Sequence, residues 1–210
     1  MTNERLELLN AGLQEIPIVE EMRVSGKNGE ELATDEAAVW KRVLQYRIAQ
    51  YYKPEIIVET HPGLGVSTTL YKMAVPDVEF KDATISPTEF SSETKNIIDI
   101  DPFGQPWDFI CSISHLINEQ TVLMISNGEA YAVRRNLVKA QRFPTTYYGK
   151  RMPVWVKEEL IPYTEKLTGL PMRFFYAFPT TVRIILSKQY LPDKLFAGCP
   201  HWMWWLSKYA

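Results

Sequence analysis

The sequence predicts an α/β fold built on an open, mostly parallel sheet with an antiparallel pair at its end. Short β-branched runs alternate with segments of helical periodicity along most of the 210 residues, which is the element order that parallel sheets require. Several of these runs end on acidic side chains, and the last two apolar runs are joined by a short connection. In sheets of this kind the ligand binds outside the carboxyl ends of the strands.

The N-terminal segment is predicted to be a helical extension of the domain. Residues 1–36 contain nine acidic and three basic residues, and four apolar side chains recur there at helical spacing. We therefore expect a helical extension over residues 1–34 and one domain over residues 35–210. A domain of this size buries enough surface to fold without a metal or a disulfide.

The domain is predicted to begin with a helix and three strands. Asp35 takes the N-cap position of a helix with a wide apolar face over residues 35–52, and Pro54 ends it. A glycine turn and a helix follow the first strand. The three predicted strands cover residues 56–58, 78–81 and 96–100.

The second half of the domain is predicted to contain two helices, a buried strand and a hairpin. The helices cover residues 109–117 and 154–167, the strand covers 121–126, and the hairpin pairs the apolar runs 172–177 and 181–187. Gly169 is the natural C-cap of the second helix. The hairpin is expected to close one edge of the sheet.

A glycine-containing turn follows the first predicted strand. Gly63 and Gly65 precede a helical segment, where absent side chains let a ligand approach the backbone and the first helical N–H groups. Glu59 at the strand end can accept a hydrogen bond from an amine or hydroxyl of that ligand. Thr68 replaces the third glycine of the dinucleotide fingerprint GxGxxG, which argues against a nicotinamide or flavin cofactor. A tight turn without any ligand stays open as the alternative.

Acidic residues also close the next two predicted strands. Asp82 takes the position at which cofactor-binding α/β folds hold ribose hydroxyls, although a solvated loop aspartate would follow the same pattern. Asp101 begins the corner Asp101-Pro102-Phe103-Gly104. This corner suits an amine on a flat heterocycle, because the carboxylate and neighbouring carbonyl accept the amino hydrogens while Phe103 stacks on the ring. A Pro-Gly turn with a local hydrogen bond from Asp101 is the alternative.

These segments resemble the class I S-adenosylmethionine-dependent methyltransferases over about residues 35–188. The corner is similar to the aspartate-proline-aromatic-glycine segment of tRNA guanine N2-dimethyltransferases, and more loosely to the DPPY-type corner of amino-methylating DNA enzymes. The resemblance implies a Rossmann-like methyltransferase fold with S-adenosylmethionine as cofactor. The cofactor-binding residues that it implies are Glu59, Thr60, Gly63, Gly65, Ser67, Asp82 and Asp99. It further implies catalytic roles for Asp101, Pro102 and Phe103, and a substrate contact at Gly104.

The chain departs from that family between its second and third predicted strands. Only 19 positions separate Asp82 from Asp101, so we expect a central β-α unit to be missing or replaced by the loop over residues 84–95. The chain also leaves no room for the separate substrate domain of the tRNA enzymes. The sequence thus predicts methyl transfer to an amino nitrogen, of a nucleobase in RNA or DNA. A non-catalytic methyltransferase-like binding module and a small-molecule methyltransferase stay open as alternatives.

A basic and aromatic segment covers residues 134–151. It contains six basic residues, no acidic ones, and interleaved aromatic side chains. Positive charge combined with stacking rings holds single-stranded nucleic acid without sequence readout, and a solvated surface loop is the alternative. The substrate-binding candidates in this segment are Arg142, Tyr147, Tyr148, Lys150 and Arg151.

Composition and charge narrow the possible partners. The net charge of -2 means that nucleic acid would need the local basic segment. Cys111 and Cys199 form no Cys/His cluster, so neither a metal site nor a disulfide framework is predicted. No apolar run approaches the ~18 residues that span a bilayer, and no targeting pattern begins the chain. A cytoplasmic protein without membrane contact is expected, and its oligomeric state is left open.

Overall fold

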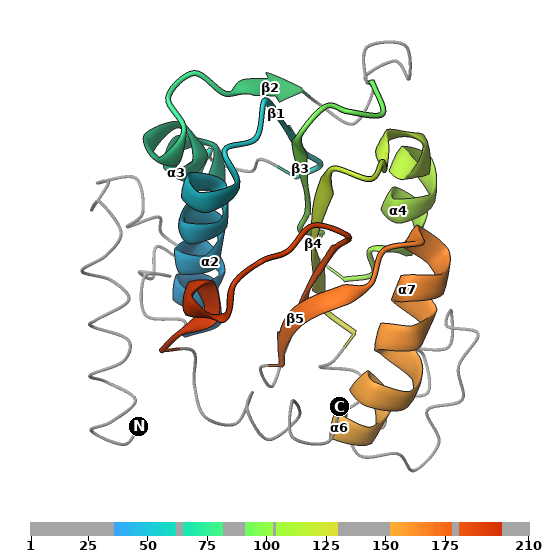
Figure 1. Ribbon diagram of the computed structural model, residues 1–210. Helices are drawn as coiled ribbons and strands as arrows, with labels where there is room; N and C mark the ends of the chain where they lie inside the picture. The colour runs from blue at the N-terminus through green and yellow to red at the C-terminus, as the bar shows by residue number, and fades with distance from the viewer. Residues whose placement is uncertain are drawn as a thin grey trace.

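The structure is a computed structural model that describes residues 36–61, 65–81, 91–102, 104–129, 152–177 and 181–198 (Figure 1). The helical extension predicted over residues 1–34 and its boundary with the domain lie outside these ranges. No helix in the described ranges is long and apolar enough to cross a membrane.

The described residues form a six-stranded sheet in the order β2-β1-β3-β4-β6-β5. Its strands are β1 (Ile56–Glu59), β2 (Glu79–Lys81), β3 (Asn96–Ile100), β4 (Thr121–Asn127), β5 (Met172–Ala177) and β6 (Val182–Ser187). Strands β1 to β4 are parallel, and β6 runs antiparallel to both β4 and β5. The predicted α/β class, the Rossmann-like, mostly parallel sheet and the terminal antiparallel hairpin are confirmed.

Helices cover both faces of this sheet, as Figure 1 shows. α2 (Glu36–Tyr52) and α3 (Val66–Ala74) pack on one face, and α4 (Trp107–Ile113) and α7 (Ile161–Thr168) pack on the other. α2 matches the helix predicted over residues 35–52. α4 begins at Trp107 rather than at the expected Phe109, because Pro106 takes the N-cap position and Asp108 lies in a first turn that favours negative charge.

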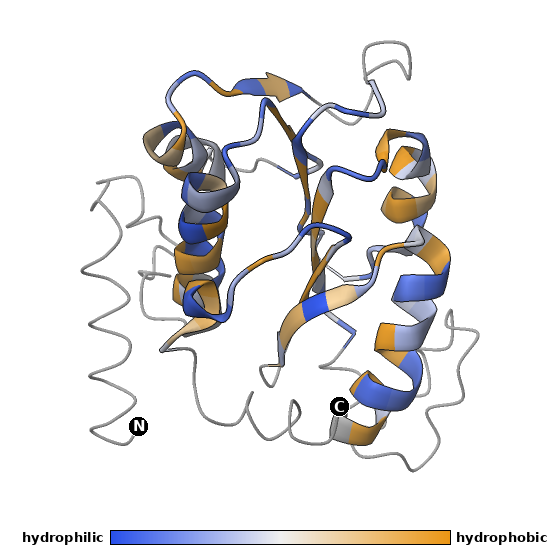
Figure 2. Cartoon of the chain, viewed as in Figure 1, coloured by the Kyte–Doolittle hydropathy of each residue, from blue (hydrophilic) through white to orange (hydrophobic). Residues whose placement is uncertain are grey.

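Side-chain alternation along the strands builds a hydrophobic core on each face. Ile57, Ile97 and Met124 face α2 and α3. The residues next to each of them in the same strand face α4 and α7. Strands that are covered on both faces are apolar along most of their length, and Figure 2 shows this hydrophobic colouring along β1, β3 and β4. A charged side chain on such a strand is therefore an exception that needs a partner.

The helix predicted over residues 154–167 is present but contains a wider turn. α6 (Met152–Trp155), the π-helical turn η6 (Val156–Leu160) and α7 follow one another directly. Pro162 has no N–H to donate and its ring would clash with the carbonyl four residues earlier. The Ile161 N–H accordingly bonds to the Val156 carbonyl, five residues back. Gly169 ends α7 with a φ of 68°, as predicted.

The segment in which we expect a β-α unit to be missing or replaced, between β2 and β3, begins at the edge strand of the sheet. β1 pairs directly with both β2 and β3, and β2 is the edge strand. The described residues between β2 and β3 contain no further strand, while residues 82–90, which include Asp82 and much of the predicted loop, lie outside the description. The middle of the sheet is continuous, and the replacement of a β-α unit by the loop stays a prediction.

Candidate functional site

The candidate site lies at the carboxyl ends of β1 and β3. β1 leads through α3 to β2 on one side, while its other neighbour, β3, comes later in the chain. At such a switch point the connections leave in opposite directions, and open α/β sheets bind their ligands there. Glu59 of β1 is in register with Asp99 of β3, and both side chains bond to residues of α2 or α3.

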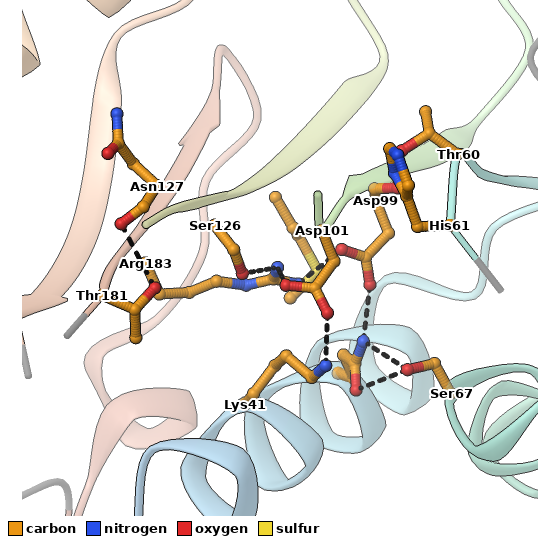
Figure 3. A network of polar contacts seen from close by, with 12 residues as sticks. Lys41, Thr60, His61, Ser67, Asp99, Asp101, Ser126, Asn127, Thr181 and Arg183 are labelled. Carbon is orange, nitrogen blue, oxygen red and sulfur yellow. Dashed lines mark hydrogen bonds and ion pairs between the residues drawn. The ribbon is translucent and has the colours of Figure 1, made fainter. Parts of the chain in front are cut away.

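Asp99 is the centre of a buried polar cluster on this face (Figure 3). Its Oδ1 accepts a hydrogen bond from Arg183 Nη2 at 2.6 Å. Its Oδ2 accepts from Gln45 Nε2 at 2.5 Å and from the Tyr71 hydroxyl at 2.6 Å. Both carboxylate oxygens of Asp99 are thus engaged by the protein, and the side chain is only 3% exposed. This geometry makes Asp99 the fixed support around which the more exposed groups are arranged.

Arg183 of β6 connects three strands beneath the site. In addition to Asp99, its guanidinium donates to Ser126 Oγ of β4 at 2.7 Å and lies 3.9 Å from Asp101 Oδ1. The side chain is completely buried. Burial lowers the pKa of Arg183, but the carboxylates of Asp99 and Asp101 raise it well above its ordinary value. A permanent positive charge therefore lies under the carboxyl ends of β3 and β4.

Asp101 forms the outer carboxylate of the site. Its Oδ2 accepts a hydrogen bond from Lys41 Nζ of α2 at 2.5 Å, and the side chain is 31% exposed. Burial alone would raise the pKa of Asp101, but Lys41 and Arg183 outweigh it and lower the pKa to about 2. Asp101 is consequently ionised at every physiological pH. It can accept hydrogen bonds, but it is too weakly basic to remove a proton.

Glu59 is the third carboxyl group of the cluster. It is buried, and its Oε2 accepts a hydrogen bond from Thr68 Oγ1 of α3 at 2.5 Å. Burial raises the pKa of Glu59 to about 7, with a smaller contribution from Asp99, while Thr68 and Lys41 oppose the shift. Unlike Asp101, this group gains and loses its proton near neutral pH.

The charges of the cluster do not cancel when all groups are ionised. Glu59, Asp99 and Asp101 supply three negative charges, and Lys41 and Arg183 supply two positive ones. With Glu59 protonated the cluster is neutral, and with Glu59 ionised it carries one net negative charge. The site is therefore suited to a ligand that brings one positive charge.

The turn after β1 brings further polar groups to the same edge. The Thr60 N–H donates to the Asp99 carbonyl at 3.1 Å, and Thr60 Oγ1 lies 2.6 Å from His61 Nδ1. The His61 ring packs edge-on against Phe109 of α4. Gly65 has a φ of 80° directly before α3, a conformation that favours glycine. Its predicted role in cofactor binding stays a prediction.

The Asp101–Gly104 corner is locked to the end of β4 by backbone contacts. The Gly104 N–H donates to the Pro102 carbonyl at 3.0 Å, and the Gly128 N–H donates to the Gly104 carbonyl at 2.8 Å. Gly104 has a φ of 126°, and a Cβ on Gly128 would lie 3.2 Å from the Gly104 Cα. A Cβ at position 128 would therefore make a tight contact with the Gly104 backbone, which would have to shift by a few tenths of an ångström.

The structure brings all of the described candidates together. Those gathered at the carboxyl ends of β1 and β3 are Glu59, Thr60, Gly65, Ser67, Asp99, Asp101, Pro102 and Gly104. Ser67, predicted to bind a cofactor, exchanges hydrogen bonds with the Gln45 side chain. The candidates outside the described residues are Gly63, Asp82, Phe103, Arg142, Tyr147, Tyr148, Lys150 and Arg151, and their roles stay predictions.

Several members of the cluster were not predicted from the sequence, among them Lys41, Gln45 and Arg183. Lys41 and Gln45 are one helical turn apart on α2, and Gln45 is fully buried there. Arg183 interrupts the apolar strand Val182–Ser187. A polar residue inside an apolar pattern was the available signal, because such a residue needs a buried partner.

Comparison with known proteins gives similarity at the level of solved structures. No protein-family model matches the chain, and no curated protein matches it.

Within the described residues, no group of three or more His, Cys, Asp or Glu side chains is placed to hold a metal ion.

The similar solved structures are methyltransferases. Trm1 from Pyrococcus horikoshii with S-adenosyl-L-methionine is 12% identical, with a TM-score of 0.48 over 70% of this chain and 53% of that chain. The O-methyltransferase TomG from Streptomyces achromogenes, in complex with SAM, is 11% identical, with a TM-score of 0.47 over 90% of this chain and 91% of that chain. An O-methyltransferase from Bacillus cereus in complex with SAH is 12% identical, with a TM-score of 0.41 over 90% and 92%. The chain spans about half the length of the Trm1 chain.

Proposed function

We propose that this protein transfers a methyl group from S-adenosylmethionine to an amino nitrogen. The observation that carries the proposal is the charge balance at the switch point, where three carboxyl groups face two cations. S-adenosylmethionine has a sulfonium, an ammonium and a carboxylate, so it brings one net positive charge to such a site. The residues around β1 and β3 fit this cofactor in both charge and hydrogen-bonding type.

The cofactor side of the site would be formed by the end of β1 and the start of α3. Glu59 offers an acceptor carboxylate, and the first backbone N–H groups of α3, directly after Gly65, would face the ligand. Asp99 stays bonded to its three donors and keeps the neighbouring groups in place. When bound, the cofactor supplies an electrophilic methyl group, and the protein supplies orientation and charge.

The target side would be formed by the Asp101–Gly104 corner. Asp101 is held ionised by Lys41 and Arg183, so it accepts a hydrogen bond from the target amine without taking its proton. The Pro102 carbonyl has a second lone pair besides the one that meets the Gly104 N–H. Two acceptors on one amino group help to turn the nitrogen lone pair toward the methyl group, and this positioning is the main catalytic contribution.

We propose a nucleobase in RNA or DNA as the carrier of that amine. The support is the basic and aromatic composition of residues 134–151, which suits phosphates and stacked bases. Arg142, Tyr147, Tyr148, Lys150 and Arg151 would make these contacts, and Phe103 would flank the base. A small-molecule amine is the outcome if labelled methyl groups enter neither RNA nor DNA.

One contact favours a second candidate, a binding module without catalysis. Lys41 Nζ bonds to Asp101 Oδ2 at 2.5 Å, and it therefore takes a position on the carboxylate that a target amine would use. In an enzyme, Lys41 must leave Asp101 or share it with the amine. In a binding module, the ion pair is permanent and the cofactor is never used.

Calorimetry with S-adenosylmethionine and S-adenosylhomocysteine separates these candidates at the first step. We expect the protein to bind both compounds. We also expect it to transfer labelled methyl groups into total RNA or DNA, where nucleoside mass spectrometry identifies the methylated base. Asp101→Asn should keep cofactor binding and lose transfer, while Glu119→Gln, which removes an exposed carboxylate, should change neither. Failure of the wild-type protein to bind either compound at millimolar concentration would refute the methyltransferase proposal.

A further inference from the structure

The Lys41 amine lies at the position that the proposed reaction gives to its target. Lys41 Nζ bonds to Asp101 Oδ2 at 2.5 Å, and Asp101 is the carboxylate that would accept the hydrogens of the target amine. The ion pair joins α2 to the residue that follows β3. Figure 3 shows the two side chains pointing toward each other. The site therefore already holds a primary amine on its acceptor carboxylate.

Lys41 also lies close to the side of the cluster where the cofactor is proposed to bind. Burial acts to raise the pKa values of Glu59 and Asp101, and the Lys41 ammonium acts to lower both of them. Its nitrogen is thus within electrostatic range of a carboxyl group on each side. Gln45, four residues later on the same face of α2, donates to Ser67 Oγ of α3 at 3.1 Å. Lys41 consequently stands between the proposed cofactor side and the proposed target side.

The ion pair of Lys41 is open enough to break and form again. The side chains of Lys41 and Asp101 are 22% and 31% exposed, whereas those of Arg183 and Asp99 are 0% and 3% exposed. A partly exposed pair contributes at most about 1 kcal/mol to stability. The lysine side chain has a flexible four-carbon stem and three rotatable N–H donors. Lys41 can therefore exchange a proton with solvent and turn its nitrogen while it stays beside Asp101.

We propose that Lys41 Nζ is a methyl acceptor of this site and that the protein methylates itself there, an inference that rests on the methyl transfer proposed above. A lysine ammonium has no lone pair, so Lys41 first releases a proton to solvent. The lone pair of the neutral amine then forms the new N–C bond while the sulfonium C–S bond breaks, and the electron pair of the C–S bond stays on sulfur. The product is a methylammonium group, which keeps its positive charge and can still donate to Asp101.

Incubation of the purified protein with labelled S-adenosylmethionine, without any other substrate, tests this site. Lys188 is the internal control, because it forms an ion pair of the same 2.5 Å length with Glu119 and is 43% exposed. Peptide mass spectrometry should find the label on Lys41 at least about 10-fold faster than on Lys188, since only Lys41 is held in position. The rate per molecule should not depend on protein concentration. It should rise between about pH 7 and 9, where more of a lysine amine is neutral.

Two matched variants assign the label to its residue. Lys41→Arg keeps a positive charge beside Asp101 and removes the primary amine, and Lys188→Arg makes the same change at the control pair. K41R should bind S-adenosylmethionine in calorimetry and lose the label. K188R should be labelled at the wild-type rate.

A second readout needs no methyl transfer. In protein labelled with 15N at its lysine side chains, NMR should show a signal of the Lys41 ammonium group that is absent in K41R. This signal should move in Asp101→Asn, which removes the charge that Lys41 contacts. It should also move when S-adenosylhomocysteine is added, a compound that has no methyl group to donate. The Lys188 signal should move in neither experiment.

The outcomes separate this inference from the function on which it rests. If the protein binds S-adenosylmethionine but labels Lys41 no faster than Lys188, the acceptor role of Lys41 is overturned, and transfer to other amines stands. A labelling rate that rises with protein concentration overturns it too, because the acceptor then belongs to another molecule. So does S-adenosylhomocysteine that binds in calorimetry and leaves the Lys41 signal unchanged. If the wild-type protein binds neither compound, the proposed function fails and this inference fails with it.

Discussion

Replacement of Arg183 by methionine tests the electrostatic foundation of the site. Arg183→Met keeps most of the side-chain volume and removes a charge that is completely buried. It deletes the 2.6 Å ion pair with Asp99 and the 2.7 Å hydrogen bond to Ser126. Asp99 keeps two hydrogen bonds, from Gln45 and Tyr71, but neither donor carries a positive charge.

The expected loss in the free energy of unfolding follows from the burial of the Arg183–Asp99 ion pair. Removing one partner of a buried ion pair typically destabilises a protein by about 3–5 kcal/mol, since the other charge is left uncompensated. For a domain of about 150–250 residues, each kcal/mol shifts Tm by roughly 2–4 °C. We therefore expect R183M to lower Tm by about 6–20 °C. The comparable loss at an exposed pair is at most about 1 kcal/mol.

Urea unfolding followed by circular dichroism measures the change, with Lys188→Met as the control. Lys188 pairs with Glu119 at 2.5 Å, but both side chains are largely exposed, so this loss should be small. The double variant Asp99→Asn/Arg183→Met should be more stable than R183M alone, because it also removes the stranded carboxylate. We expect a coupling free energy of about 0.5–3 kcal/mol between the two sites.

The reasoning is refuted if R183M costs no more than the Lys188→Met control. It is also refuted if removal of the Asp99 charge gives no recovery in the double variant. Either result would mean that the carboxylates are neutralised by protonation or by water rather than by the guanidinium.

Three further predictions concern the carboxyl groups and the glycine contact. In the folded protein the pKa of Glu59 is about 7, above the ~4.3 of a glutamate in an unfolded chain. Between pH ~4.3 and about 7 the folded protein therefore binds more protons than the unfolded chain, and the protein loses stability as the pH rises through this range. Glu59→Gln should therefore gain stability relative to the wild type between pH 4.5 and 7.5, and an equal difference at both pH values would contradict this. Lys41→Met should raise the pKa of Asp101 from about 2, which NMR titration measures. It should lower the free energy of unfolding by at most about 1 kcal/mol, because both side chains are partly exposed. An unchanged pKa would mean that Lys41 does not stabilise the carboxylate. Gly128→Ala would place a Cβ 3.2 Å from the backbone of Gly104 and should cost about 1–3 kcal/mol in denaturant unfolding, whereas wild-type stability would show that the two strand ends separate freely.

The helices and strands of the fold could be predicted from local patterns in the sequence. The apolar strands, the α2 helix, the Gly169 cap and the terminal hairpin all follow from patterns within a few residues. Hydrophobic periodicity and turn residues act locally, so they can be read from one segment at a time. The strand ends that carry Glu59 and Asp101 were also predicted, because open parallel sheets present their carboxyl ends to ligands.

Which charged groups of the site neutralise one another depends on contacts between distant segments of the chain. Arg183 reaches Asp99 across 84 positions of sequence, and Lys41 reaches Asp101 across 60. These pairs depend on the strand order, which places β3 and β4 together and brings β6 beside β4. The sequence predicted that Asp101 accepts the hydrogens of a target amine, whereas in the structure its carboxylate is paired with Lys41. Burial and the distances between charges set proton affinity, and both arise only when distant segments pack together.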